Sequence, residues 1–176
     1  MSIRVRKANT DDAEAIARVQ VDTWRTTYQG IVSEEYLSNM SYDRPRRMWE
    51  RFLLDEKSQN SVYVAEDDSG KVLGFVGCGP DRDNDPTYRG EIYAVYVVQE
   101  TQMRGIGKEL MLTAAKDLRD RGFNSMIVWV LADNPSRRFY ERLGGIRVQT
   151  RSIRVGGKLL EEYGYGWKDL RSLADA

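Results

Sequence analysis

One stretch, between Gly90 and Gly122, constrains the fold of this chain more than any other. It opens with an apolar run at 92–98 that is typical of a strand, and it closes with an amphipathic helical pattern. The apolar positions of that pattern are Ile106, Leu110, Met111, Ala114 and Leu118. Gly105 and Gly107 lie in the turn between them, where backbone N–H groups meet the positive end of the helix dipole. Because glycine lets an anion approach the backbone closely, the stretch predicts a strand–turn–helix unit that binds a pyrophosphate.

Two common phosphate-binding motifs do not describe this turn. A dinucleotide-binding fold has G-x-G-x-x-G after its first strand, whereas here the third glycine is missing and the unit lies in mid-chain. A Walker loop requires Gly-Lys-Ser/Thr, but Gly107 and Lys108 are followed by Glu109. The turn therefore belongs to neither class.

The remaining patterns predict one mixed sheet with helices on both faces. Strands are expected at 2–8, 62–66, 71–79, 92–98, 126–131, 146–155 and 158–167. Helices are expected at 10–30, 34–40, 43–53, after the glycine turn, and at 134–144. Hairpin turns require antiparallel pairs, while the unit at 91–131 allows one parallel pair through a right-handed crossover. We predict a single domain, residues 1–170, followed by a C-terminal tail, residues 171–176.

The composition excludes several kinds of function. Lys and Arg number 27 and Asp and Glu also number 27, so the net charge is zero, whereas a general nucleic-acid binder carries a basic excess. Histidine is absent, which excludes Ser-His-Asp and Cys-His triads and any His-ligated metal. Acid–base chemistry must then fall to Glu, Asp, Tyr, Lys or Cys. We expect no nucleic-acid partner and no metal.

Cysteine usage and hydropathy predict the compartment. Cys78 is the sole cysteine, so no intrachain disulfide can form, and a reducing compartment is expected. Without a histidine to activate it, Cys78 is interpreted as a small packed strand residue rather than a nucleophile. The first residues lack an apolar signal core, and no run reaches the roughly 18 apolar residues of a membrane helix. We expect a cytoplasmic protein without a membrane partner.

Two motifs together suggest a family. The string Gln102-x-x-Gly105-x-Gly107 follows a strand and precedes a helix, and Asn134 and the string at 139–144 come later in the chain. With both motifs in this order, the chain resembles the GNAT-type N-acetyltransferase superfamily, and the predicted element order matches that fold over nearly the whole length. The resemblance implies an α/β fold whose mostly antiparallel central sheet is splayed, with helices on both faces.

The resemblance also implies a reaction. GNAT enzymes transfer the acetyl group of acetyl-CoA to a primary amine by direct attack in a ternary complex. In such enzymes the strand that matches 92–98 splays from the strand that matches 126–131, and the pantetheine arm lies between them. The implied cofactor-binding residues are Val95, Val97, Val98, Gln102, Met103, Arg104, Gly105, Ile106, Gly107, Lys108, Asn134, Ser136 and Tyr140. Arg104 could equally be a solvated surface residue, and Asn134 could serve only as a helix cap.

Tyr140 is the implied general acid. Phe139 and Leu143 are four residues apart and are expected to pack inward, so Tyr140 is expected to turn away from the core, onto a face shared with Ser136 and Arg137. In the family the tyrosine at this position protonates the leaving thiolate. The alternative is a tyrosine that only orients the cofactor.

Glu91 is the candidate general base. It precedes Gln102 by eleven residues, a separation like that of the base glutamate in the histone-acetylating branch of the family. Strand alternation would place Glu91, Tyr93, Val95 and Val97 on one face, so that Glu91 points to the acetyl group. A carboxylate can accept the proton of an incoming ammonium directly or through water. Glu91 could instead be a solvated residue at the start of a strand, with Tyr93 as a lesser candidate.

Residues other than these motifs are the candidates for contact with the acceptor amine. Trp24 and Tyr28, on the first helix, either pack in the core or overhang a substrate site, and Tyr93 is a third candidate. Four glutamates near the expected acceptor side could attract a cation or simply be solvated: Glu34, Glu35, Glu161 and Glu162. A small-molecule or peptide amine is expected, and the resemblance allows a homodimer through the last hairpin. An acyl-CoA-binding sensor without turnover is the alternative function.

Overall fold

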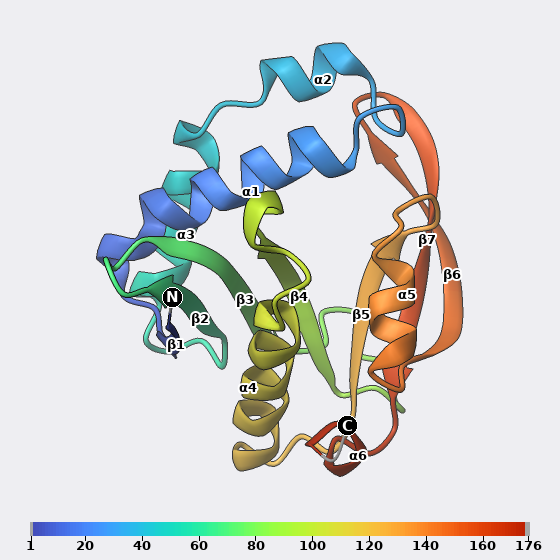
Figure 1. The fold of residues 1–176 in the computed structure, drawn as a ribbon. Coiled ribbons are helices and arrows are strands. Elements are labelled where there is room, and N and C mark those ends of the chain that lie inside the picture. The colour runs from blue at the N-terminus through green and yellow to red at the C-terminus, as the bar shows by residue number, and fades with distance from the viewer. Residues whose placement is uncertain (1, 175–176) are drawn as a thin grey trace.

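The computed structural model describes residues 2–174 of the chain, and its seven strands form one sheet in the order β1-β2-β3-β4-β5-β7-β6 (Figure 1). The strands are β1 (Ile3–Lys7), β2 (Ser61–Asp67), β3 (Val72–Pro80), β4 (Gly90–Val97), β5 (Met126–Leu131), β6 (Ile146–Val155) and β7 (Lys158–Trp167). The helices are α1 (Ala13–Thr27), α2 (Glu34–Asn39), α3 (Asp43–Leu54), α4 (Ile106–Asp120), α5 (Arg137–Arg142) and α6 (Arg171–Ala174).

Strand pairing confirms the predicted mixed sheet. Every neighbouring pair is antiparallel except β4 and β5, which run parallel across the α4 crossover. The hairpins β2–β3 and β6–β7 form as predicted, because their turns contain glycines with positive φ. The parallel pair divides the sheet into two antiparallel halves, β1–β4 and β5–β7–β6.

Alternate residues of the central strands bury their side chains on opposite faces. Val76 of β3 and Val95 of β4 belong to a core cluster with α4, whereas Phe75 and Tyr96 pack in a cluster with α1 and α3. This period of two is the reason that the sheet needs a helix layer on each face. A third cluster joins the end of α1 to the tip of the β6–β7 hairpin through Tyr28, Val32, Leu37, Leu131, Val155 and Leu160.

Three predicted boundaries differ in the structure. Helix α1 ends at Thr27 with Tyr28 as its cap, before Gly30. Helix α5 begins at Arg137 rather than Asn134, because the intervening residues form a tighter turn. Part of the predicted C-terminal tail forms the short helix α6, which packs on α4, and Leu173 is fully buried in the core. Residues 175–176 of the predicted tail lie outside the described residues.

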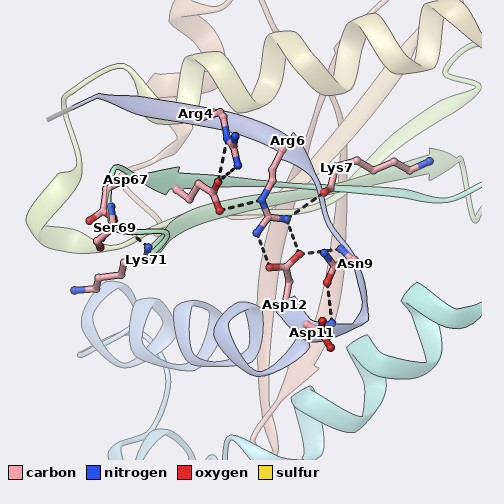
Figure 2. Close-up of polar contacts among 10 residues, drawn as sticks. Arg4, Arg6, Lys7, Asn9, Asp11, Asp12, Asp67, Ser69 and Lys71 are labelled. Carbon is pink, nitrogen blue, oxygen red and sulfur yellow. Dashed lines mark hydrogen bonds and ion pairs between the residues drawn. The ribbon is translucent and has the colours of Figure 1, made fainter.

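A polar network ties the first strand to the first helix (Figure 2). Arg6 bridges two buried carboxylates: it contacts Asp12 at 2.8 Å through two nitrogens and Glu66 at 2.9 Å. Arg4 contacts the other oxygen of Glu66, and Asp12 also accepts the N–H of Asn9 in a capping box. These charges are paired and hydrogen-bonded, as buried charges must be.

No helix among residues 2–174 combines the length and apolar character needed to cross a membrane.

Candidate active site

The two halves of the sheet separate partway along β4 and β5. Their pairing covers only Gly90–Ile92 of β4 and Met126–Val128 of β5, although both strands continue beyond it. Figure 1 shows the two strands side by side at their starts and diverging toward α1. The expected splay is therefore present, and the separation between the two strands beyond Ile92 and Val128 is called the opening below.

A bulge in β4 accompanies the splay. Gly77 of β3 faces Ala94 while Cys78 faces Ile92, so Tyr93 is an extra residue in β4. The bulge breaks the alternation of side chains. Ile92 shares the α4 face with Val95 and Val97, whereas Ala94 and Tyr96 pack on the opposite face. Glu91 directly precedes Ile92 in regular pairing with β3, so by alternation it also belongs to the opposite face. The prediction that Glu91, Val95 and Val97 share one face is wrong for this reason.

Backbone groups of β4 face the opening. The N–H of Val98 donates to Leu73 of β3 at 2.8 Å, so by alternation the backbone groups of Val95 and Val97 point away from β3. The carbonyl of Val97 accepts a hydrogen bond from the side chain of Gln102 at 3.0 Å. The N–H groups of Val95 and Val97 remain directed into the opening, whereas Val98 uses its N–H on Leu73 and its carbonyl on Thr101.

The glycine turn after β4 is rich in free N–H groups. Met103 has φ 62° and Gly105 has φ 84°, and the first helical hydrogen bond runs from Glu109 to Gly105 at 3.0 Å. Within the part of the chain that the structure describes, the backbone N–H groups at 103–108 have no partner. The N–H of Gln102 is already bonded to Gln99 at 3.2 Å. Such a concave set of N–H groups at a helix start favours an anion.

The side chains of the glycine turn differ in their exposure to solvent. Met103, Arg104 and Lys108 are exposed, while Ile106 is buried and presents only its backbone. A Cβ at Gly107 would lie 3.2 Å from the ring of Phe139 in α5. Glycine therefore allows the start of α4 to approach α5 and brings the two sequence motifs together.

Tyr140 lies in the core, contrary to prediction. Only 6% of its surface is exposed, and its ring packs on Phe139 at 5.3 Å and on Tyr165 of β7 at 6.1 Å. Helix α5 has neighbours on two sides, α4 and β7, so Tyr140 is covered as well as Phe139 and Leu143. Its hydroxyl has no hydrogen bond to any residue in 2–174, and burial raises its pKa, so that the phenol stays protonated at neutral pH.

Asn134 links α5 to α1. Its buried side chain accepts the N–H of the exposed Ser136 at 2.8 Å and donates to the hydroxyl of Tyr28 at 3.1 Å. Asn134 is therefore not the predicted N-cap of α5, because Ser136 is the N-cap residue, and the Asn134 side chain instead closes the turn that precedes the helix.

Aromatic side chains from α1 meet β4 at the opening. Trp24 packs on Tyr28 with ring centroids 4.5 Å apart and donates its indole N–H to the hydroxyl of Tyr96 at 3.0 Å. Tyr28 is buried in the third core cluster, and Trp24 packs against it. Sequence reasoning missed Tyr96, because strict alternation on β4 would place its side chain opposite Glu91 and the bulge reverses that relation.

Glu91 and Tyr93 meet Arg82. Glu91 is 1% exposed, and both of its oxygens accept hydrogen bonds from Arg82, the shortest at 2.6 Å. This hydrogen bonding raises the pKa of Arg82. Arg82 also lies over the ring of Tyr93 at 4.8 Å, and the Tyr93 hydroxyl donates to the Pro80 carbonyl at 2.6 Å. Neither residue shares a hydrogen bond with Trp24 or Tyr28 in the described chain.

A second buried carboxylate belongs to Glu162 of β7. Only 7% of Glu162 is exposed, while Glu34, Glu35 and Glu161 are exposed. Arg151 of β6 contacts Glu162 at 2.5 Å and Asp83 at 2.8 Å. Strand alternation could have indicated that Glu162 and Glu161 face opposite sides of β7, but not which of them is buried.

Cys78 is fully buried, as expected of a packed strand residue, and burial raises the pKa of its thiol to about 12. Among residues 2–174, no group of three or more His, Cys, Asp or Glu side chains is arranged to hold a metal ion.

Comparison with known proteins agrees with this geometry. The model of the acetyltransferase (GNAT) family matches residues 21–145. An uncharacterized N-acetyltransferase, YuaI of Bacillus subtilis (strain 168), is 39% identical over 171 residues, which are 97% of this chain and 96% of that protein. A spermidine N(1)-acetyltransferase of Thermoplasma acidophilum is 24% identical over 136 residues, covering 76% of this chain and 81% of that protein.

A solved structure shares the fold. The PaiA N-acetyltransferase of Thermoplasma acidophilum, crystallised in complex with coenzyme A, superposes with a TM-score of 0.74 and 25% identity, over 92% of this chain and 98% of that one. Relatives over nearly the full length are thus named N-acetyltransferases, and this chain is an acyltransferase. The protein belongs to the acetyltransferase (GNAT) family.

Proposed function

We propose that this protein transfers the acetyl group of acetyl-CoA to a primary amine by direct attack in a ternary complex. The observation that carries the proposal is the opening between β4 and β5, with free backbone N–H groups on one wall and a ring of free N–H groups at 103–108 beside it. An amide-bearing arm fits the first set, and a pyrophosphate fits the second. Acetyl-CoA has both parts and supplies the activated acetyl group.

The residues have distinct proposed tasks in binding. The N–H groups of Val95 and Val97 pair with the pantetheine arm and polarise the thioester carbonyl. The N–H groups at 103–108 hold the pyrophosphate, with Arg104 and Lys108 adding positive charge. Asn134 and Ser136 lie on the α5 side of the opening, where they contact the arm.

Tyr140 is proposed as the general acid. Its hydroxyl is unpartnered within residues 2–174, and burial keeps it protonated, so it can donate its proton to the thiolate that leaves. Its position in α5, beside Phe139 and the start of α4, supports this role.

Glu91 is proposed as the proton acceptor for the incoming ammonium. Its burial, and its place in β4 just before the strands separate, support this role. Both oxygens contact Arg82, so proton transfer requires either a bridging water or a movement of the Arg82 side chain.

The acceptor is proposed to be a small-molecule or peptide amine that approaches Trp24 and Tyr28. The name of the spermidine N(1)-acetyltransferase relative supports a small amine.

We also propose a cytoplasmic location, supported by the single unpaired Cys78. A homodimer through the β6–β7 hairpin is proposed because Ile146 and Leu159 are 69% and 59% exposed there.

A free-thiol release assay tests the function. Purified protein with acetyl-CoA should release coenzyme A faster when a panel of alkylamines, amino acids and peptides is added, and the acceptor should gain an acetyl group by mass spectrometry. Retained acetyl-CoA binding with no thiol release over the whole panel would instead indicate an acyl-CoA-binding protein.

A further inference from the structure

Glu162 is a buried charge in a place where the core does not require one. It lies on β7 opposite Leu131 of β5 and is 7% exposed, next to the cluster that joins α1 to the last hairpin. Removing a carboxylate from water is costly unless it is paired. The other three glutamates of this region are exposed, so Glu162 alone among the four bears this cost.

Arg151, the ion-pair partner of Glu162, is held by three contacts. Arg151 contacts Oε1 of Glu162 at 2.5 Å, pairs with Asp83 at 2.8 Å, and lies 3.8 Å from the ring centroid of Trp129. Only one oxygen of Glu162 is used in this way. The second, Oε2, accepts no hydrogen bond from the described residues and is not among their fully enclosed polar atoms.

The charges of this group do not cancel. Asp83 and Glu162 each carry a negative charge in their ionised forms and Arg151 one positive charge, which leaves a net charge of one negative. Glu91, by comparison, has both oxygens bound by Arg82 in a pair that is neutral by itself. A cationic ligand would therefore find at Glu162 a free carboxylate oxygen and a negative charge that Arg151 does not neutralise.

Two tyrosines face the same region. The Tyr28 hydroxyl accepts a hydrogen bond from Asn134, and the Tyr96 hydroxyl accepts one from Trp24. Each hydroxyl oxygen keeps a second lone pair. Glu162 is paired with Leu131 of β5, so the two side chains lie on the same face of the sheet, and Leu131 packs with Tyr28 and Trp24 in the third core cluster. Burial raises the pKa of both tyrosines, and the negative charge of Glu162 adds to the shift. An ammonium group has three donors, and these three oxygens offer it three acceptors.

We propose that Glu162 is the residue that binds the ammonium group of the acceptor, and that it selects cationic amines without a carboxylate beside the amine. This inference rests on the proposed acetyl transfer. The amine would lie between Glu162 and the hydroxyls of Tyr28 and Tyr96, with Trp24 covering it. A free amino acid would bring its own carboxylate toward Glu162, and Arg151 could not compensate because Glu162 and Asp83 already engage it.

The experiment compares three acceptors of equal chain length: a linear alkyl diamine, the matching monoamine and the matching amino acid. Wild-type protein should use the diamine and monoamine and reject the amino acid. Glu162→Gln should raise the KM for the diamine by about 10- to 100-fold, the loss expected for a hydrogen bond to a charged group, with little change in KM for acetyl-CoA. Glu162→Asp, which keeps the charge, should recover much of the affinity.

Glu161→Gln is the matched control, since Glu161 is the exposed neighbour on the same strand. It should leave every constant unchanged. Equal KM values for wild type and Glu162→Gln would overturn the proposal. If the Glu162 variants do not fold, the wild-type protein still decides: binding of the amino acid as tightly as the diamine would also overturn it.

Calorimetry separates this inference from the proposed function. Titration of the diamine into wild-type protein saturated with coenzyme A measures acceptor binding without turnover. Binding that weakens in Glu162→Gln supports the proposal even if no amine releases thiol. If wild type and Glu162→Gln acetylate the diamine with the same kinetic constants, acetyl transfer is supported and the role of Glu162 is rejected.

Discussion

Tyr140 shows how one hydroxyl can be separated from the packing of its ring. The ring contributes to the core through Phe139 and Tyr165, but the hydroxyl has no partner among residues 2–174. Tyr140→Phe should therefore leave the melting temperature nearly unchanged, because no buried group loses a hydrogen bond.

The same substitution should lower kcat by about 10- to 1,000-fold with little change in KM for acetyl-CoA, because the general acid is lost. Steady-state kinetics by thiol release would measure both constants. Tyr165→Phe is the control: the Tyr165 hydroxyl already donates its proton to Glu141 at 2.9 Å, so its removal should spare kcat. Full turnover by Tyr140→Phe would refute the acid role.

Glu91 and Glu162 should differ in the constant that each controls. Glu91→Gln preserves the shape of the contact with Arg82 but removes the charge, so kcat should fall by about 100-fold or more if Glu91 accepts the proton. KM for the acceptor should change little, in contrast to Glu162→Gln. If Glu91→Gln turns over normally while its thermal stability falls, Glu91 serves only to hold Arg82.

At the scale of elements, the bulge in β4 and the glycine turn bring the residues of the candidate site together. The bulge at Tyr93 moves Tyr96 to the face of Trp24, and the splay beyond Ile92 turns the N–H groups of Val95 and Val97 into the opening. The turn then leaves six consecutive backbone N–H groups, at 103–108, without a partner among the described residues.

Gly105→Ala tests whether the turn conformation matters for the ligand. Gly105 has φ 84°, and the space that a Cβ would occupy there is open, so the variant should lose about 1 kcal/mol of unfolding free energy through backbone strain alone. Because the turn would shift, KM for acetyl-CoA should rise by roughly 3- to 10-fold.

Gly122→Ala is its matched control. Gly122 follows α4, has φ 88° and also has nothing within contact distance, so a similar loss in chemical denaturation is expected. Its KM for acetyl-CoA should stay at the wild-type value. Equal KM changes in the two variants would mean that the Gly105 effect reflects stability rather than the anion site.

At the scale of the whole molecule, the network of Arg6, Asp12 and Glu66 joins the outer strands to α1. This network should make the free energy of unfolding depend on pH in the acidic range. Hydrogen bonds to Arg6 lower the pKa of Asp12, and those to Arg4 and Arg6 lower the pKa of Glu66. The unfolded chain therefore takes up protons at a higher pH than the folded one. The contribution is complete above about pH 5 and is lost as the pH falls through about 4 and below.

Asp12→Asn should remove part of this dependence. At neutral pH the variant should lose about 2 kcal/mol of unfolding free energy, because a buried carboxylate that bonds Arg6 and the Asn9 N–H becomes neutral. The difference from wild type should shrink toward pH 3 in urea unfolding curves. Asp120→Asn, in an exposed pair with Lys116, should cost far less. A constant difference across pH would contradict this account.

Much of the fold follows from the sequence alone, because it depends on local chemistry. Apolar periods of two and of about 3.6, hairpin turns and the glycine turn predict the order of strands and helices and one parallel pair. The motif at Gln102, Gly105 and Gly107 also indicates an anion site, since free N–H groups at a helix start depend only on neighbouring residues.

Only the tertiary structure decided which side chains meet at the opening. The bulge at Tyr93 depends on pairing with β3, so no pattern within β4 reveals that Glu91 and Val95 face opposite ways. Burial of Tyr140 depends on both α4 and β7, and burial of Glu162 depends on Arg151 from β6 and on the cluster that reaches α1. These contacts join residues far apart in the chain, and their geometry exists only after the sheet and helices have packed.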